Sequence, residues 1–315
     1  MKPLAATDNI LIIKLAALGD FVQALGPMQA IRRHHPNARL TLLTTAPFEP
    51  LAALSGWFDG IWLDSRPKWH QPVAWLSLRR RLRRGHFRRV YDLQTSDRSS
   101  GYLKLWWPDP RPEWSGIAAG CSHRHANPDR DRMHTLERQA EQLVAAGIEH
   151  TPPPDLDWLD GDVDGFDLPA RFALIAPGGA PHRPDKRWPA ERYRALAENL
   201  AARDIMPVSI GTPADGPATA ALAGVGRDLV GATDLLQLAG LARRAMLAIG
   251  NDTGPMHLAA AIGCPTLVLY SHASDPALCL QRGPNVAIVR RPRLEDLSLE
   301  QVTHELEALV DGATS

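Results

Sequence analysis

Residues 246–262 read MLAIGNDTGPMHLAAAI, which is an apolar run, then a polar loop, then a second run of small apolar residues. We predict a buried strand over 246–250 and a helix that starts at Pro255, because proline suits the first position of a helix. The free N–H groups at the start of a helix attract a diphosphate. In this loop the Thr253 hydroxyl adds a donor, and Asp252 can accept from sugar hydroxyls, unless Asp252 only caps the helix.

The rest of the chain repeats this change from a short apolar run to a longer amphipathic stretch. Such alternation is typical of a parallel sheet whose strands are joined by crossover helices. The expected strands are 10–15, 39–44, 61–63, 90–93, 172–176, 206–210, 246–250, 265–270 and 286–289. The expected helices are 21–34, 72–84, 99–106, 134–147, 188–203, 234–243, 255–262 and 298–310. The fold class that we expect is therefore α/β.

Three consecutive prolines, Pro152–Pro154, interrupt the alternation, and an acidic stretch over 155–167 follows them. Neither a helix nor a central strand continues through such a run. We therefore place a domain boundary here, with one domain over 1–154 and another over 155–315. Tandem α/β domains usually bind a ligand in a cleft at the carboxyl ends of their strands.

The composition argues against several classes of protein. The 315 residues carry no formal net charge, so nothing in the whole chain favours nucleic acid. The charge is uneven, because residues 1–155 hold 21 Lys and Arg against 15 Asp and Glu. The three cysteines form no Cys-x-x-Cys pair, which fits a reducing, cytoplasmic compartment and argues against a zinc site. The apolar run at 10–13 is too short to span a membrane.

Gly19 and Asp20 directly follow the first expected strand. Gly19 allows a tight turn, and Asp20 is expected to open the next helix, where aspartate is a favoured N-cap residue. The same carboxylate would lie at the carboxyl edge of a sheet, where it could take a proton from an attacking hydroxyl. The two interpretations can coexist. One glycine is too few for the GxGxxG fingerprint of a dinucleotide site, which argues against an NAD-dependent oxidoreductase.

A second loop, Pro177-Gly178-Gly179, also follows an expected strand and leads to Lys186. Glycines let the backbone approach a ligand closely, and the lysine supplies a point charge for a phosphate. A solvated loop that ends where Pro189 starts a helix is equally consistent with these residues. For His257, at the end of the opening motif, a satisfied interior histidine is the alternative to a ligand contact.

Together these stretches resemble the ADP-heptose:lipopolysaccharide heptosyltransferases of glycosyltransferase family 9. The resemblance covers most of the chain, and its most specific part is the last motif at its spacing from Lys-x-Trp-Pro. The motifs that carry it are Gly19-Asp20, Tyr91–Gln94, Met133–Arg138, Pro177–Gly179, Lys186–Pro189, Val230–Thr233 and Asn251–His257.

The resemblance implies a GT-B fold, with two Rossmann-like domains that face each other across a cleft. It implies an enzyme that moves a heptose, or a related sugar, from an ADP-sugar to a lipopolysaccharide core acceptor, by an inverting, metal-independent reaction without a cofactor. The N-terminal domain would hold the acceptor, and the C-terminal domain the nucleotide sugar. Asp20 would be the general base, and Lys186 would neutralise the departing diphosphate. The donor would be bound by Gly178, Gly179, Gly231, Asp252, Thr253, Gly254, Met256 and His257, and the acceptor by Gln94 and Arg98.

A departing diphosphate needs either a metal ion or fixed donors to stabilise its charge. Metal-dependent sugar transferases usually present a paired-aspartate motif after a strand. The two motifs with that spacing, Asp129-Arg-Asp131 and Asp160-Gly-Asp162, lie in polar, loop-like stretches. We interpret both as solvated turns and expect no metal site.

The chain departs from the family pattern in two loops. After Gln94 the family usually has a glycine and then a lysine, where this chain has Thr95 and, at the basic position, Arg98. After the strand that ends at Tyr270, the residues 271–276 replace the usual Gly-Pro-Thr-Asp-Pro. The alternatives left open are a different donor, a protein acceptor, and a non-catalytic module that binds a nucleotide sugar.

Residues 79–89 contain seven arginines, and four tryptophans precede them. A basic helix with aromatic neighbours can lie on an anionic membrane surface, or it can bind the phosphates of a core acceptor. A solvated surface helix is the alternative. With the membrane-embedded acceptor that the resemblance implies, we expect peripheral contact with the cytoplasmic face of the inner membrane through Arg79–Arg89.

Overall fold

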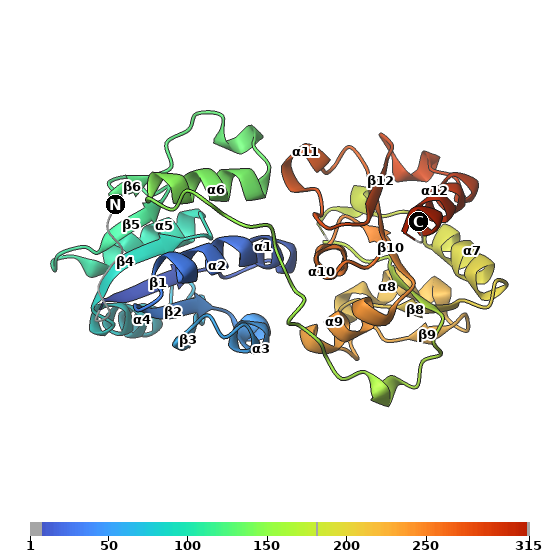
Figure 1. Ribbon diagram of the computed structural model, residues 1–315, viewed down its shortest axis with the longest axis horizontal. Helices are drawn as coiled ribbons and strands as arrows, with labels where there is room; N and C mark the ends of the chain where they lie inside the picture. Colours follow the sequence, from blue (N-terminus) through green and yellow to red (C-terminus); the bar gives the residue numbers. More distant parts are fainter. Residues whose placement is uncertain (1–7, 181, 314–315) are drawn as a thin grey trace. The chain divides into compact units, whose positions relative to one another are not determined.

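The computed structural model describes residues 8–180 and 182–313, and the chain divides between Pro154 and Asp155 into two units, unit 1 and unit 2. Each unit contains a six-stranded sheet in which neighbouring strands are parallel. Helices lie between successive strands in both units, except between β5 and β6 of unit 1 (Figure 1). The predicted α/β class, with two Rossmann-like sheets, is confirmed.

The sheet of unit 1 has the strand order β3-β2-β1-β4-β5-β6. Its strands are β1 (Asn9–Ile13), β2 (Arg39–Thr44), β3 (Gly60–Leu63), β4 (Phe87–Asp92), β5 (Glu113–Gly116) and β6 (His123–Arg124). Its helices are α1 (Leu18–Gln23), α2 (Leu25–His34), α3 (Glu49–Leu54), α4 (Pro72–Arg84), α5 (Asp97–Tyr102) and α6 (Thr135–Ala145). Leu11 and Ile13 share a hydrophobic cluster with α4, and α6 contacts α1 and α2. Ile10 and Ile12 point to the other face and are also buried, so both faces of β1 are covered.

The sheet of unit 2 has the strand order β12-β11-β10-β7-β8-β9. Its strands are β7 (Phe172–Ala176), β8 (Met206–Ser209), β9 (Arg227–Asp228), β10 (Leu247–Asn251), β11 (Thr266–Tyr270) and β12 (Val286–Arg290). Its helices are α7 (Ala190–Ala201), α8 (Gly216–Thr219), α9 (Leu235–Arg244), α10 (Gly254–Ile262), α11 (Pro276–Cys279) and α12 (Leu299–Ala313). Ile249 of β10 packs in one cluster with Leu196 of α7 and Val302 of α12. The helix α10 contacts α9, β10 and β11.

The close packing of α10 on the sheet requires glycine at position 250. A Cβ atom on Gly250 would lie 2.7 Å from the carbonyl oxygen of Ala176 and 2.8 Å from the sulfur of Met256. Real Cβ atoms do not approach other atoms so closely, so any side chain here would push α10 away from the sheet. Gly250 therefore helps to set where α10 begins relative to the end of β10.

The predicted helix over 21–34 is wrong in its continuity and in its start. Two helices replace it, and Ala24 separates them. The helix α1 begins at Leu18, so Asp20 is its third residue and not its N-cap. The Asp20 carboxylate instead accepts a hydrogen bond from the N–H of Ala17, over 3.3 Å. Acidic residues are favourable at both positions, which explains the error.

Six short elements were not predicted: α3, α8, α11, β5, β6 and β9. The strands β6 and β9 have two residues each, and β5 reads EWSG. None of these three contains the apolar run by which buried strands are found. They extend each sheet at one end. The residues of β6 and β9 are largely exposed, whereas Trp114 and Ser115 of β5 are fully buried.

The strand predicted from Val90 begins three residues earlier, at Phe87, and thereby takes in Arg88 and Arg89. Arg89 is only 2% exposed, and its Nε donates to Glu113 over 2.7 Å. Burial lowers the pKa of Arg89, but the neighbouring Tyr91 and Glu113 outweigh this effect and raise it. The expectation that the whole of 79–89 is a surface for a partner is therefore wrong at Arg89.

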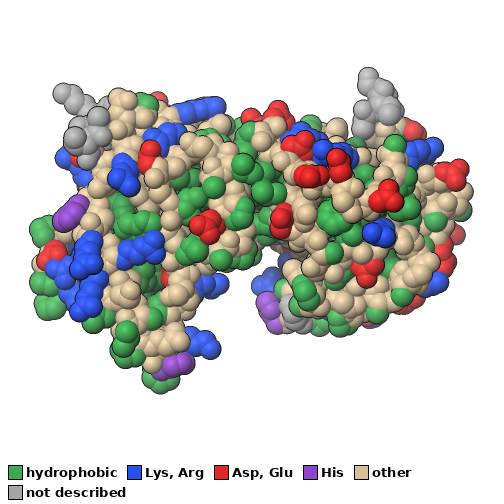
Figure 2. Space-filling model, turned by 90° about the horizontal axis from the view of Figure 1, so that it is seen from below, with side chains coloured by type: hydrophobic (Ala, Val, Ile, Leu, Met, Phe, Trp, Pro, Cys, Tyr) green, Lys and Arg blue, Asp and Glu red, His purple; other side chains and the backbone are tan. Residues whose placement is uncertain are grey.

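The arginines of α4 divide into two groups. Arg79 donates to the carbonyl oxygens of Leu105 and Trp107, and Arg83 forms an ion pair with Asp109. The exposed arginines of this helix are Arg80, Arg81 and Arg84. Figure 2 shows Lys and Arg side chains gathered beside hydrophobic ones on unit 1.

Candidate functional site

The residue at the end of β10, Asn251, connects three segments of unit 2. Its Nδ2 donates to the carbonyl oxygens of Pro177 and Gly178, over 2.8 Å and 3.0 Å. Its Oδ1 accepts from the Trp188 N–H and from the Tyr193 hydroxyl, both over 3.0 Å. Asn251 is fully buried, so the loop after β7, the start of α7 and the loop after β10 are fixed to one another.

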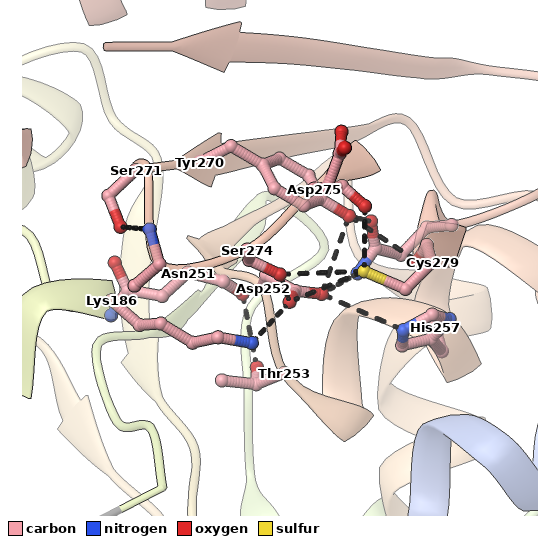
Figure 3. A network of polar contacts seen from close by, with 12 residues as sticks. Lys186, Asn251, Asp252, Thr253, His257, Tyr270, Ser271, Ser274, Asp275 and Cys279 are labelled. Carbon is pink, nitrogen blue, oxygen red and sulfur yellow. Dashed lines mark hydrogen bonds and ion pairs between the residues drawn. The ribbon is translucent and has the colours of Figure 1, made fainter. Parts of the chain in front are cut away.

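The next residue, Asp252, lies at the centre of a group of polar contacts (Figure 3). Its Oδ2 accepts from Lys186 Nζ over 2.7 Å and from the Ser274 hydroxyl. Its Oδ1 accepts from Gln281 Nε2 over 2.9 Å, and the Tyr270 hydroxyl in turn donates to Gln281 over 2.7 Å. Asp252 is therefore held from both sides, by Lys186 before α7 and by the segment after β11.

These contacts determine the charge of Asp252. Burial raises the pKa of its carboxyl group, but the hydrogen bonds from Lys186 and Ser274 and the charge of Lys186 outweigh burial. The pKa of Asp252 therefore lies below the usual value for an aspartate, and the group is ionised at neutral pH. Lys186 and Asp252 form a largely buried ion pair, since their side chains are 12% and 7% exposed.

The helix α10 begins beside this ion pair. Thr253 is its N-cap in an extended conformation, but the Thr253 hydroxyl contacts the carbonyl oxygen of Asn251 over 3.2 Å and does not cap the helix. The first N–H groups of a helix have no partner within the helix, so the turn from Gly254 offers donors to an anion. Of the predicted donor residues, Met256 is buried, and His257 is mostly buried with Nε2 3.8 Å from Asp252. The interior interpretation of His257 thus agrees with its burial.

The predicted glycines of the donor site lie along the edge next to this group. The carboxylate of Asp215 accepts from the N–H of Gly179 over 3.1 Å, and a Cβ on Gly178 would overlap that same carboxylate. Gly231 has a positive φ of 73°, and a Cβ there would lie 2.9 Å from Pro213. Asp215 was not predicted as a site residue, because the sequence around it, Thr-Pro-Ala-Asp, is that of an ordinary turn.

In unit 1, a polar cavity of about 130 Å³ lies where β1 and β4 end. Asp20 and Gln94, two of the predicted site residues, both line it. The lining residues are Lys14, Asp20, Leu93, Gln94, Thr95, Arg130, Thr135, Arg138 and Gln139. The cavity therefore brings together residues that are as many as 125 positions apart in the sequence.

The loop after β4 has an unusual backbone at Thr95. Its φ is 46°, in the left-handed region that favours glycine, which is the residue the family usually has there. The Thr95 N–H donates to Asp92 Oδ1 over 3.0 Å, and Arg130 donates to the Thr95 hydroxyl over 2.8 Å. Gln94 also connects the loops after β1 and β4, because its Oε1 accepts hydrogen bonds from the N–H groups of Leu15 and Ala16.

Asp92 lies beneath this loop and is fully buried. Its Oδ1 accepts from the N–H groups of Gln94 and Thr95, whereas its Oδ2 is buried without a hydrogen-bond partner. Burial is the main cause that raises the pKa of Asp92 to about 6, and the hydrogen bonds and Lys14 limit the rise. Asp92 therefore neutralises the basic residues around it less at pH 6 than at pH 8.

Arg98 is not among the residues that line the cavity. It donates to the carbonyl oxygen of Pro67 over 3.1 Å, and its guanidinium lies 5.7 Å from the centre of the Trp75 ring. The structure thus brings Asp20 and Gln94 together but leaves Arg98 with the loop before α4. The basic residues that do line the cavity, Lys14, Arg130 and Arg138, were not predicted as site residues.

Within 8–180 and 182–313, no three His, Cys, Asp or Glu side chains are grouped so that they could hold a metal ion. Across the same residues, each helix is too short or too polar to cross a bilayer.

Comparisons with known proteins identify similar chains. A family model for glycosyltransferase family 9 (heptosyltransferase) matches residues 75–305. Lipopolysaccharide heptosyltransferase 2 of Escherichia coli (strain K12) is 35% identical over 301 residues, which cover 84% of this chain and 83% of that protein.

Solved structures share the fold. A family 9 glycosyltransferase from Veillonella parvula DSM 2008 superposes with a TM-score of 0.83 at 20% identity, covering 99% of this chain and 100% of the other. The E. coli heptosyltransferase WaaC with ADP-2-deoxy-2-fluoro heptose gives a TM-score of 0.73 at 20% identity, covering 95% and 99%. The predicted GT-B fold class is thereby confirmed.

Proposed function

Because the chain belongs to glycosyltransferase family 9, and is thus a glycosyltransferase, we propose that it transfers a heptose or a related sugar from an ADP-sugar to a lipopolysaccharide core acceptor. The observation that carries the proposal is the position of the Lys186–Asp252 ion pair beside the start of α10. An ammonium group and free helix N–H groups together suit the diphosphate of a nucleotide sugar. The relative solved with an ADP-heptose analogue supports this choice of donor.

Unit 2 would bind the nucleotide sugar, and unit 1 the acceptor. When the bond between the sugar and the diphosphate breaks, negative charge grows on the leaving oxygen. Lys186 and the N–H groups at the start of α10 would stabilise this charge, which is the task of a metal ion in other transferases. On this proposal the reaction is metal-independent and needs no cofactor.

Asp252 has a supporting role in this proposal. Each of its oxygens already accepts hydrogen bonds from the chain, so a hydroxyl of the donor sugar has to share or replace one of these partners. Its first effect is then to hold Lys186 in position. Thr253, Gly254 and His257 would complete the donor contacts, with Gly178, Gly179, Gly231 and Met256 shaping the surrounding backbone.

Asp20 would be the general base. It is partly exposed at the cavity of unit 1, where it could take the proton of the attacking hydroxyl. A direct attack of this hydroxyl on the sugar carbon, from the side opposite the diphosphate, inverts the configuration at that carbon. Gln94 and Arg98 were expected to contact the acceptor, and Gln94 is the one that lies beside Asp20.

The test is a ligand screen followed by a transfer assay. Only a ligand that binds the native protein raises the midpoint of thermal unfolding, so ADP-heptose should raise it more than UDP- or GDP-sugars do. With a core acceptor, mass spectrometry should then detect the glycosylated product. A thermal shift without product from any saccharide or protein acceptor would favour the alternative of a non-catalytic module. A larger shift with another nucleotide would reject the ADP-sugar.

We also propose that the protein is cytoplasmic and touches the anionic face of the inner membrane through α4. Trp69 and Val73 are 89% and 81% exposed, and Leu76 is also exposed. Val73 and Leu76 line a groove of about 550 Å³, whose other lining residues are Trp62, Ser77, Arg80, Arg81, Arg84 and Gly85. Exposed tryptophan and aliphatic side chains beside arginines suit a bilayer surface.

Replacing Arg80, Arg81 and Arg84 by glutamine should weaken binding to vesicles of anionic phospholipid at least tenfold. Each basic group near such a surface contributes about 1 kcal/mol, so three of them exceed this threshold. Cosedimentation at low salt measures the effect. The control replaces three exposed arginines elsewhere, Arg33, Arg171 and Arg227, so that the net charge is the same. Equal binding by the two triple variants would refute the α4 surface.

A further inference from the structure

The cavity of unit 1 contains more positive charge than its carboxylates neutralise. Lys14 directly follows β1, Arg130 belongs to the turn Arg130–Arg132, and Arg138 lies on α6. Asp20 is the one acidic side chain in the lining. Asp92 lies close by, but it is buried beneath the loop after β4 and has a raised pKa. Three basic groups thus converge on a small space with one exposed counter-charge.

Arg130 has few partners in this position. Its side chain is 15% exposed, and its Nε is buried without a hydrogen-bond partner. One Nη donates to the neutral hydroxyl of Thr95, and the other contacts Asp131, whose own side chain is 91% exposed. An ion pair with a carboxylate in water is weak, so the Arg130 guanidinium retains most of its charge where it lines the cavity.

The basic groups also repel one another. Burial is the main cause that lowers the pKa of Lys14 and of Arg130, and the charge of Arg138 lowers both further. Arg138 itself donates to the hydroxyl of Thr135, a neutral partner, over 3.0 Å. An anion in the cavity would relieve this repulsion and would accept charge-assisted hydrogen bonds from the guanidinium groups that line it.

We propose that this cavity is an anion subsite, in which Arg130 and Arg138, with the charge of Lys14, bind a carboxylate or phosphate group of the acceptor beside Asp20. The inference rests on the proposed function, which makes unit 1 the acceptor domain. The volume of about 130 Å³ suits one such group and not an entire sugar ring. Two guanidinium groups suit it chemically, because their paired N–H donors match the oxygens of both anions.

The subsite has a consequence for the reaction. An acceptor that is bound by its anionic group presents each of its hydroxyls at a set distance and direction from the cavity. The subsite would therefore select the hydroxyl that reaches Asp20, which makes Arg130 and Arg138 residues that set specificity. Arg98, which is bound to Pro67, is not needed for this role.

The experiment compares Arg130→Gln and Arg138→Gln with Arg132→Gln, a control in the same turn whose side chain is 87% exposed. Ligand-detected NMR titrations use methyl glucuronoside for a carboxylate, glucose 6-phosphate for a phosphate, and methyl glucoside as the neutral probe. We expect the wild type and Arg132→Gln to bind at least one anionic probe at least tenfold more tightly than the neutral probe. Arg130→Gln and Arg138→Gln should lose this preference, and the probe that binds better identifies the anion.

Three results would overturn the subsite: no preference for an anionic probe in the wild type, a preference that Arg130→Gln keeps, or the same loss in Arg132→Gln. The thermal shift with ADP-heptose checks that each variant is folded and binds the donor. Arg130→Lys keeps the positive charge but not the paired N–H donors. Its affinity for the anionic probe should therefore lie between that of the wild type and that of Arg130→Gln. These titrations need no turnover. Anion binding without any transfer product would therefore refute the proposed function and leave the subsite standing.

Discussion

The Asp20→Asn variant is expected to lose transfer by a factor of about 10² to 10⁴, the usual contribution of a general base. Asparagine keeps an oxygen that can accept from the Ala17 N–H, so the start of α1 should remain folded. What it lacks is the ability to take a proton from the attacking hydroxyl. The loss should appear in kcat, measured as product formed from ADP-heptose and the core acceptor.

Two controls separate chemistry from binding in this variant. Its thermal shift with the donor should equal that of the wild type, because the proposed donor residues all lie in unit 2. Asp109→Asn removes another carboxylate of unit 1, one that pairs with Arg83 and does not line the cavity, and should transfer normally. Normal turnover by Asp20→Asn would exclude this residue as the base and would require another group in unit 1.

The Lys186→Gln variant should lose both transfer activity and folding stability. A second substitution, Asp252→Asn, should restore part of the stability but not the activity. Without its ammonium group the departing diphosphate lacks a cation, which should lower kcat by about 10² to 10³. The Asp252 carboxylate would remain buried with only Ser274 and Gln281 as strong partners. Breaking a buried pair from one side typically costs about 3 kcal/mol of unfolding free energy or more, measurable by urea denaturation.

The double variant Lys186→Gln/Asp252→Asn tests the cause. It removes the unpaired charge, so it should recover part of the stability while staying as inactive as the single variant. A double variant whose destabilisation equals the sum of the two single ones would show that the pair is not coupled. The pH dependence has a definite sign. Since the pKa of Asp252 is lowered in the folded state, its stabilising contribution is present above the usual aspartate pKa and is lost on further acidification.

Sequence patterns identified the long, buried elements of the fold and failed at the short or polar ones. The strands β7 and β2 were predicted with their observed bounds, and β10 and β11 within one residue, because runs of apolar residues must be buried on both faces. The predicted start of β4, at Val90, lies three residues too far along the chain, because Arg88 and Arg89 are typical of surface positions. The pairing of Arg89 with Glu113, on the neighbouring strand, and with the Tyr91 hydroxyl makes an arginine acceptable there.

The candidate site was predictable where its residues follow strands, and not where distant loops converge. Gln94, Lys186 and Asp252 could be named because turns after parallel strands form one edge of a sheet. One partner of Asp252, Ser274, comes from the loop in which the chain departs from its family, and it still provides a hydroxyl there. No spacing rule could place Arg130 rather than Arg98 beside Asp20. Their positions depend on how the segment from β6 to α6 folds back over the end of β4.

The amide of Asn251 has consequences for motion. All four of its hydrogen-bonding positions are occupied, and each bond reaches backbone or a buried hydroxyl. The segments around Pro177, Trp188 and Asn251 must therefore shift together or not at all. On the proposed function, a nucleotide sugar would therefore meet a preformed backbone at this edge of the sheet and would not have to order these three segments as it binds.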